Sequence, residues 1–472
     1  MKVFGIAATN IIFMEIVGTQ NLRRSVLQIA WPVVLRTSLN MFVQLVDMAM
    51  VGTLGAVPLA AVGLGNQIFF FSVAVVEAFS IGTTALVAQA VGKGDLKTAQ
   101  KVAAQSVAAV LMTTLALSVI LIVFSRQLIS GLVFFMPEKD LAVISLGSRY
   151  LSLVGISASL RFSMLAVNAV FQGGGNTHTP LLLMILANVI NLAGNYLLIF
   201  GIGPFPAMGV EGAALATALA GMIAGGLSLA LLFTGVSPVR LDLKRPGLFK
   251  FQKGIIGKVI SVGVPSAIEQ ITIHTSQIVY SMITASLGTM AVAAHQIMHS
   301  AYTATYLPGK GFSLAATTLV GQFLGARKQK QALRSGLITA RFATVLMSLA
   351  GLFFFFFPRA VAGLFTGDPA VLALTVSPLR LLALAQPALA YIVALNGGLR
   401  GAGDTRWPMG LTILNMLGLR LILTLAAVRL GYGLAGVWAA MLIESYLRAS
   451  LIAYRFNSRI PQAEPLLKKS SG

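Results

Sequence analysis

The stretch "NMFVQLVDMAMVGTLG" at residues 40–55 holds one carboxylate, Asp47, within an apolar run that is unusually long for a soluble helix. The rest of the chain has the same character. Of its 472 residues, 57% are hydrophobic and 10% are charged, whereas a soluble domain has about 25% charged residues. Because so much apolar surface cannot be hidden from water, we expect the chain to lie in lipid.

Apolar runs of membrane-spanning length recur along the chain. A hydrocarbon core about 30 Å thick is crossed by roughly 20 apolar helical residues. Twelve runs meet this criterion: 27–51, 62–90, 102–124, 143–168, 180–200, 208–235, 257–284, 291–321, 336–357, 370–396, 408–428 and 433–454. Only helices and closed barrels span lipid, and these runs lack the alternation of barrel strands. The sequence therefore predicts an all-α membrane protein with twelve transmembrane helices.

The distribution of basic residues predicts the orientation. The formal net charge is +21, and basic segments such as 92–101, 239–254 and 325–334 fall on the side that carries both termini. The loops of the opposite side hold few basic residues: Arg126, Lys139, Arg359 and Arg429. Such a bias marks the cytoplasmic side. We therefore expect a multi-pass protein of the plasma (inner) membrane with cytoplasmic termini, and no nucleic-acid partner.

The chain is also a tandem duplication. Residues 32–92 align with 265–325 without a gap, so that "TALVAQAVG" (84–92) lies on "TTLVGQFLG" (317–325). Further on, "GGGNTHTPLLLMIL" (173–186) aligns with "GAGDTRWPMGLTIL" (401–414). Six spans per half is an even number, so the repeats are parallel and related by an axis along the membrane normal. We expect two six-helix lobes around a V-shaped central cleft, which is a transporter architecture.

The duplication divides the chain into five parts. They are an N-terminal cytoplasmic segment (1–26), an N-lobe (27–236), a basic cytoplasmic linker (237–256), a C-lobe (257–455) and a cytoplasmic tail (456–472). Residues 1–20 lack a clear cleavage site, and Met14 is an alternative start to Met1.

Several kinds of reactive site are missing from the sequence. It has no cysteine, its four histidines show no HExxH spacing, and no GK[ST] follows its glycine clusters. We therefore expect no enzymatic activity and no cofactor besides a coupling ion, H⁺ or Na⁺. The expected partners are small organic substrates and the lipid bilayer, and the expected state is a monomer.

Four of the thirteen acids lie at least four residues from either end of a predicted span: Asp47, Glu77, Glu269 and Glu444. A charge at mid-bilayer costs about 2.5–3.5 kcal/mol, so such a group usually faces a cavity or a partner. A buried carboxylate can exchange a proton near neutral pH or stay ionised and bind Na⁺. The alternative role for Asp47 is a hydrogen bond that locks helices together. For Glu444 we expect a bond to residues close to it and no role in coupling.

At four aligned positions, an aspartate or asparagine is found in the first half only. Asn188, Asn191 and Asn195 share one helix face, whereas the aligned residues of the second half are Met416, Leu419 and Leu423. Asp47 itself aligns with Tyr280. We therefore predict a cation-coupling site formed by Asp47, Asn188, Asn191 and Asn195, which would be a metal site at Asp47 only with Na⁺.

The motifs "LVDMAMVGTLG", "GTTALVAQAVGKGD" and "FQGGGNTHTP" of the first half, with "VGVPSAIEQ" and "LRGAGDTR" of the second, resemble the multidrug and toxic compound extrusion (MATE) transporters of the MOP flippase superfamily. The resemblance covers nearly the whole chain. It implies twelve helices in two lobes and export of bulky, often cationic organic compounds in exchange for H⁺ or Na⁺. Asp47 matches the first-helix aspartate that such proteins use in cation coupling.

The chain departs from the family pattern at three positions. Archaeal proton-linked members carry an aspartate where Asn195 stands, many members carry a glutamate where Ile273 stands, and some sodium-linked members carry an acid near Leu389. The remaining lone carboxylate favours protons over sodium. A runner-up function in the same superfamily is a lipid-linked oligosaccharide flippase.

The alignment also places opposite charges at equivalent positions, Arg36 with Glu269 and Glu77 with Lys310. We predict that Arg36–Glu269 closes the cytoplasmic side and that Glu77–Lys310 lies deeper, as ion pairs of a two-state gate. Glu269 is then a gate, a second coupling site, or both. The alternative is that each charge pairs within its own lobe or snorkels to the membrane surface.

The predicted substrate cleft draws on adaptable methionines, aromatic rings that attract cations, and glutamines. Its candidates are Gln44, Met41, Met48, Phe69, Phe70, Gln277 and Tyr280. Packing against lipid or other helices is the alternative role for the methionines and phenylalanines.

Overall fold

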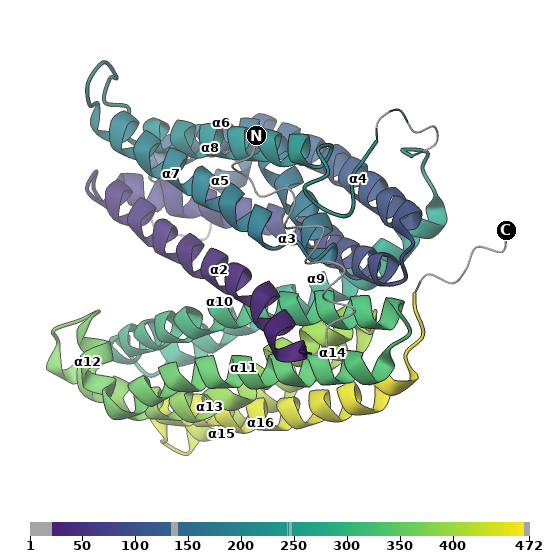
Figure 1. Ribbon diagram of the computed structural model, residues 1–472. Coiled ribbons are helices and arrows are strands. Elements are labelled where there is room, and N and C mark those ends of the chain that lie inside the picture. Colours follow the sequence, from purple (N-terminus) through teal and green to yellow (C-terminus); the bar gives the residue numbers. More distant parts are fainter. Residues whose placement is uncertain (1–20, 134–139, 243, 245–247, 467–472) are drawn as a thin grey trace. The chain divides into compact units, whose positions relative to one another are not determined.

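A computed structural model describes residues 21–133, 140–242, 244 and 248–466. These residues form helices without a strand (Figure 1), and the connection between the two halves runs from residue 232 to residue 252. Most of the predicted N-terminal segment, with Met1 and Met14, lies outside the described residues. So do Lys139 and parts of the predicted linker and tail.

Every predicted span coincides with a helix. The first six are α2 (Leu22–Gly52), α3 (Ala56–Gly92), α4 (Leu96–Val123), α6 (Leu141–Gly173), α7 (His178–Phe200) and α8 (Gly209–Leu231). The second six are α9 (Lys253–Ala285), α10 (Thr289–Gly325), α11 (Gln329–Phe356), α13 (Pro369–Gly401), the run α14–η2–α15 (Arg406–Arg429) and α16 (Gly433–Arg459). The predicted helical fold is thus confirmed. Within the described part of the chain, ten helices are long and apolar enough to cross a membrane.

Three local features lie outside the predicted pattern. Short helices α5 (Ser125–Val133) and α12 (Pro358–Gly363) follow α4 and α11, and both are too short to appear as spans. Within the eleventh span, residues Ile413–Leu419 form a π-helical turn, η2. A turn of this kind widens the helix by one residue and often marks a functional site. Hydropathy does not reveal it, because the turn is as apolar as its neighbours.

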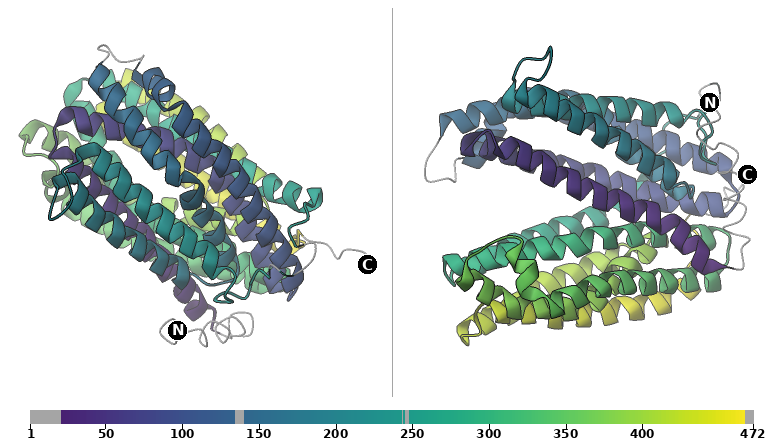
Figure 2. Two further views of the ribbon diagram at one scale, coloured as in Figure 1. Left: turned by 90° about the horizontal axis from the view of Figure 1, so that it is seen from above. Right: turned by 60° about the vertical axis from the view of Figure 1, so that its left-hand side comes forward.

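The described helices belong to two compact units. The first unit contains residues 38–87 and 95–263, and the second contains residues 264–466 together with 21–37 and 88–94. In the first unit, α6 packs against α4 and α8, and α7 packs against α8. In the second unit, α13 packs against α10, α11 and α16, which run side by side in Figures 1 and 2.

Aligned positions of the two halves have the same local geometry. Gly175 and Gly403, in the aligned turns after α6 and α13, have φ angles of 87° and 81°, which favour glycine because it lacks a Cβ. At the other ends of these helices, Asp140 and Asp368 are the aligned N-caps, and each side chain accepts a backbone N–H at 2.8 Å. The sequence repeat is therefore also a structural repeat.

A reciprocal contact joins the C-terminal turns of α3 and α10. A Cβ added to Gly92 would lie 1.9 Å from the carbonyl oxygen of Gln322, and one added to Gly325 would lie 2.0 Å from that of Gln89. Gly92 aligns with Gly325, and Gln89 aligns with Gln322. The exchange of aligned residues across this contact is the mark of a local pseudo-two-fold axis.

Candidate functional site

In the first unit, Asp47 lies against an amide of a neighbouring helix. Its Oδ1 accepts a hydrogen bond of 2.7 Å from Nδ2 of Asn195. Asp47 is half-buried in the second half of α2, whereas Asn195 in α7 is only 1% exposed. The structure therefore brings together two of the four residues that we predicted as a coupling site.

A chain of amides continues from this pair toward α8. Nδ2 of Asn195 also lies 3.5 Å from Oδ1 of Asn191, whose own Nδ2 donates to Oγ1 of Thr217 at 3.1 Å. The spacing of four residues places both asparagines on one face of α7. Asn188 is half-buried about one turn earlier. Thr217 joins this network from a helix that the sequence pattern did not connect to it.

A basic residue, Arg161 of α6, is also part of the environment of Asp47. It interacts electrostatically with Asp47, and its guanidinium lies 4.7 Å from the centre of the Phe69 ring. Phe69 in turn stacks on Phe162 at 4.7 Å. We did not predict Arg161, because the bases that we predicted within the spans, Arg36 and Lys310, are those aligned with an acid. Its signal was present, since a cation within the span 143–168 is as unusual as an acid.

The structure divides the predicted cleft residues between the two units. In the first unit, Phe69 is buried, Gln44 and Met48 are exposed and Met41 is half-buried. The side chain of Phe70 lies outside the described part of the structure. In the second unit, Gln277 is half-buried and Tyr280 is buried. Their role as a substrate cleft stays a prediction.

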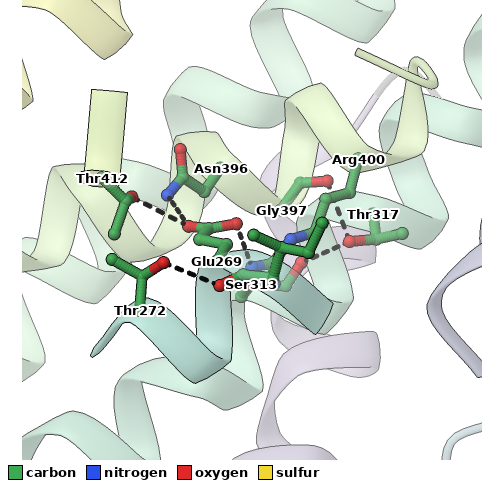
Figure 3. A network of polar contacts seen from close by, with 9 residues as sticks. Glu269, Thr272, Ser313, Thr317, Asn396, Gly397, Arg400 and Thr412 are labelled. Carbon is green, nitrogen blue, oxygen red and sulfur yellow. Dashed lines mark hydrogen bonds and ion pairs between the residues drawn. The ribbon is translucent and has the colours of Figure 1, made fainter. Parts of the chain in front are cut away.

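Glu269, in the second unit, is the centre of a buried polar network (Figure 3). It is 2% exposed, and its Oε2 forms an ion pair of 2.8 Å with Nη2 of Arg400. Its Oε1 accepts a hydrogen bond of 3.0 Å from Nδ2 of Asn396 and lies 3.5 Å from Oγ1 of Thr412. Three helical segments, α9, α13 and α14, therefore meet at one carboxylate.

This network bears on the predicted gate. Glu269 pairs with a cation of its own unit, which is the alternative that we gave for the gate charges. Arg36 belongs to the second unit as well, and Glu77 to the first. Nζ of Lys310 lies 5.8 Å from the centre of the Tyr306 ring. The pairs Arg36–Glu269 and Glu77–Lys310 stay predictions.

A second charged cluster of the second unit lies around α16. Glu444 is fully buried and forms an ion pair of 2.9 Å with Arg448, four residues along the helix. The guanidinium of Arg420 lies 4.1 Å above the ring of Tyr280. The Tyr280 hydroxyl donates to the carbonyl of Met416, inside the π-helical turn. Tyr280, the residue aligned with Asp47, is thus surrounded by cations and a backbone carbonyl.

The described residues contain no group of three or more His, Asp or Glu side chains that would hold a metal ion.

Comparison with known proteins assigns the family. The MatE family model matches residues 32–197 and 265–426, one segment in each half. The chain is 30% identical over 442 residues to the probable multidrug resistance protein NorM of Thermotoga maritima, covering 91% of both chains. It is 26% identical over 437 residues to the uncharacterized transporter YisQ of Bacillus subtilis, covering 92% of this chain and 94% of that one.

Solved structures share the fold. A multidrug resistance MATE family transporter of the MOP superfamily, in an outward-facing conformation, matches with a TM-score of 0.85 at 22% identity, over 94% of this chain and 97% of that one. The family match and the close relative agree with the motifs around Asp47 and in the aligned turns. The chain therefore belongs to the MatE family.

Proposed function

We propose that the protein is a secondary active multidrug efflux transporter. It exports organic, often cationic compounds by antiport with a coupling cation, H⁺ in preference to Na⁺, and alternates access between its two lobes. The relatives named as multidrug resistance proteins support the efflux function. The observation that carries the coupling is the contact of 2.7 Å between the Asp47 carboxylate of α2 and the Asn195 amide of α7.

The surroundings of Asp47 are suited to the reversible binding of a cation. Oδ1 of Asn195 is buried and accepts no hydrogen bond from the described residues. A buried acceptor without a donor costs about 1–3 kcal/mol, and a proton on Asp47 or a bound cation would offset that cost. The coupling cation and a cationic substrate would therefore compete for one negative charge.

The hydrogen-bond partner of Asp47 supports the choice of proton. That partner is an amide, Asn195, and not a second acid, and one carboxylate suffices to bind a proton. Arg161 interacts electrostatically with Asp47 but disfavours H⁺ and Na⁺ alike, because each brings one positive charge to the site.

The test is transport in proteoliposomes with an imposed pH gradient, with ethidium as the cationic substrate. Asp47→Asn should abolish gradient-driven ethidium transport, because an amide cannot exchange a proton. Glu211→Gln is the matched control, since it also replaces an acid by its amide but at a solvent-exposed pair with Arg149. It should transport like the unaltered protein.

The sodium content of the buffer identifies the coupling ion, independently of the test of the coupling residue. Transport that persists without sodium supports H⁺, and transport that requires a sodium gradient supports Na⁺. Unchanged transport by Asp47→Asn in both buffers would contradict the proposed coupling site.

A further inference from the structure

Arg161 of α6 is a cation to which the proposed coupling mechanism gives no role. An arginine side chain stays protonated in proteins, so it brings a permanent positive charge into the membrane-spanning helices. It is half-buried and forms no direct ion pair with any carboxylate in the described part of the chain. Because a charge within a span is costly and usually faces a partner or a cavity, we expect Arg161 to have a function.

The stem of the Arg161 side chain is held against α8. A Cβ added to Gly221 of α8 would lie 3.0 Å from Cδ of Arg161, so the stem lies directly over this glycine. One turn further along, a Cβ added to Gly225 would lie 2.2 Å from the carbonyl oxygen of Leu160. The two glycines are four residues apart on one face of α8, and they let α6 approach closely at Arg161.

The charged end of the side chain is held by an aromatic ring of α3. The guanidinium of Arg161 lies 4.7 Å from the centre of the Phe69 ring, within the range of a cation–π interaction. Phe69 is itself fixed by its stacking on Phe162. Contacts at both ends of the side chain therefore keep the positive charge in one place, where it interacts electrostatically with Asp47.

The groups around Asp47 sum to zero charge when Asp47 is ionised. Arg161 contributes one positive charge and Asp47 one negative charge. Tyr150, which also interacts electrostatically with both, is a phenol that is uncharged near neutral pH and donates to Oδ1 of Asn66 at 3.0 Å. Asn195, the hydrogen-bond partner of Asp47, is uncharged as well. A bound cation therefore adds its whole charge to a balanced site.

A second positive charge is harder to accommodate in this site than the first. The carboxylate of Asp47 can offset one charge, and Arg161 repels any other. The repulsion between like charges grows as the dielectric constant falls, so it is stronger among membrane-spanning helices than in water. A divalent organic cation meets this repulsion with a charge that Asp47 does not offset.

We propose that Arg161 is a specificity-determining residue that restricts the Asp47 site to organic cations with one positive charge and disfavours those with two. The inference rests on the proposed competition between the coupling cation and a cationic substrate at Asp47, and it adds a charge limit to the substrate class. Phe69 and Gly221 are positioning residues in this scheme, because they act by fixing the place of the Arg161 charge.

Two rigid cations of nearly equal size separate charge from shape. Methylphenylpyridinium carries one positive charge, and methyl viologen carries two on a frame of two linked rings of the same kind. Binding of each to the purified protein is measured by titration calorimetry at mildly alkaline pH, where protons compete least. Methyl viologen should bind at least about tenfold more weakly. Equal or tighter binding of methyl viologen to the unaltered protein overturns the proposal without any variant.

Arg161→Gln tests the residue itself. Without the permanent charge, both probes should bind more tightly and methyl viologen should gain more, so the ratio of the two dissociation constants should fall by about tenfold. Arg161→Lys keeps the charge and should keep the ratio. A purely structural role of Arg161 would change both affinities alike. An unchanged ratio in a well-folded Arg161→Gln protein overturns the proposal.

Arg380→Gln is the matched control. Arg380 of α13 also lies beside an aromatic ring, with its guanidinium 5.8 Å from the centre of Phe355, but it belongs to the second unit. This variant makes the same change in net charge and should keep the ratio of the unaltered protein. A ratio that falls equally in Arg380→Gln overturns the assignment to Arg161.

The two proposals fail separately. If Asp47→Asn abolishes gradient-driven transport but the ratio does not respond to Arg161→Gln, only the charge limit is overturned. If the ratio responds to Arg161→Gln but transport survives in Asp47→Asn, only the coupling site is contradicted.

Discussion

Asp47 and Tyr280 show how one residue sets the chemistry of an otherwise repeated scaffold. They occupy aligned positions, in α2 and α9. Asp47 accepts a hydrogen bond from the Asn195 side chain of α7, whereas Tyr280 donates to a backbone carbonyl of the aligned helix. The polarity of each half is therefore decided by side chains rather than by the path of the backbone.

The Tyr280 hydrogen bond gives a prediction about stability. Tyr280→Phe keeps the ring beneath Arg420 but leaves the Met416 carbonyl without this donor, so it should destabilise the protein by about 1 kcal/mol. A lower thermal unfolding midpoint of the purified protein checks it. Tyr432→Phe, at a side chain that is 67% exposed, should leave the midpoint unchanged. Equal midpoints for both variants would argue against a structural role for the hydroxyl.

The ion pair between Glu269 and Arg400 gives a second prediction about stability. Removing one partner of a buried pair leaves an isolated charge and typically costs about 3–5 kcal/mol. Arg400→Met should therefore lower the thermal midpoint strongly. The double variant Glu269→Met/Arg400→Met should recover much of that loss, because no isolated charge remains. A double variant less stable than Arg400→Met would show that the polar network as a whole matters more than charge balance.

At the residue scale, the sequence predicted which polar side chains come together on one helix. It predicted less well which side chains come together from several helices. The face shared by Asn191 and Asn195 follows from helical spacing alone. The partners of Glu269 do not, because Asn396, Arg400 and Thr412 lie more than a hundred residues away. Arg161 and Arg420 carried a readable signal, as charges within apolar spans, but neither is aligned with an acid of the other half, as Arg36 and Lys310 are.

At the scale of the helices, glycine determines how closely two segments approach. Gly92→Ala and Gly325→Ala would each place a Cβ about 2 Å from a carbonyl oxygen across the contact between α3 and α10. Both variants should therefore fold poorly, with a low yield of monodisperse protein on size-exclusion chromatography.

The control for these variants is Gly226→Ala in α8, where an added Cβ meets nothing within 4 Å. Alanine is favoured over glycine inside a helix by roughly 0.5–1 kcal/mol, so this variant should be as stable as the original or slightly more so. Normal yields for Gly92→Ala would mean that the close contact is not essential.

The helices themselves were the most predictable part of the fold. Lipid requires every span to satisfy its own backbone hydrogen bonds, so a long apolar run has almost no alternative to a helix. The π-helical turn at Ile413–Leu419 could not be predicted in this way. Its neighbours are Tyr280 of α9, which donates to the Met416 carbonyl, and α16, and no periodicity encodes such contacts.

At the scale of the whole molecule, the orientation in the membrane remains a prediction that the chain makes easy to test. The protein has no cysteine, so single cysteines can be introduced without prior changes. With cytoplasmic termini, Lys97→Cys lies on the cytoplasmic side and Arg429→Cys on the opposite side. In intact cells, a membrane-impermeant maleimide should label only Arg429→Cys. Labelling of Lys97→Cys alone would indicate the reverse orientation.

The reciprocal contact of Gly92 and Gly325 has a consequence for the origin of the chain. Each glycine meets the backbone of the other repeat at the equivalent residue, which is the form of an isologous interface in a symmetric homodimer. A single six-helix ancestor would need only one such glycine to associate with a second copy of itself. Gene fusion then preserves the pairing, and afterwards each copy is free to acquire its own charges.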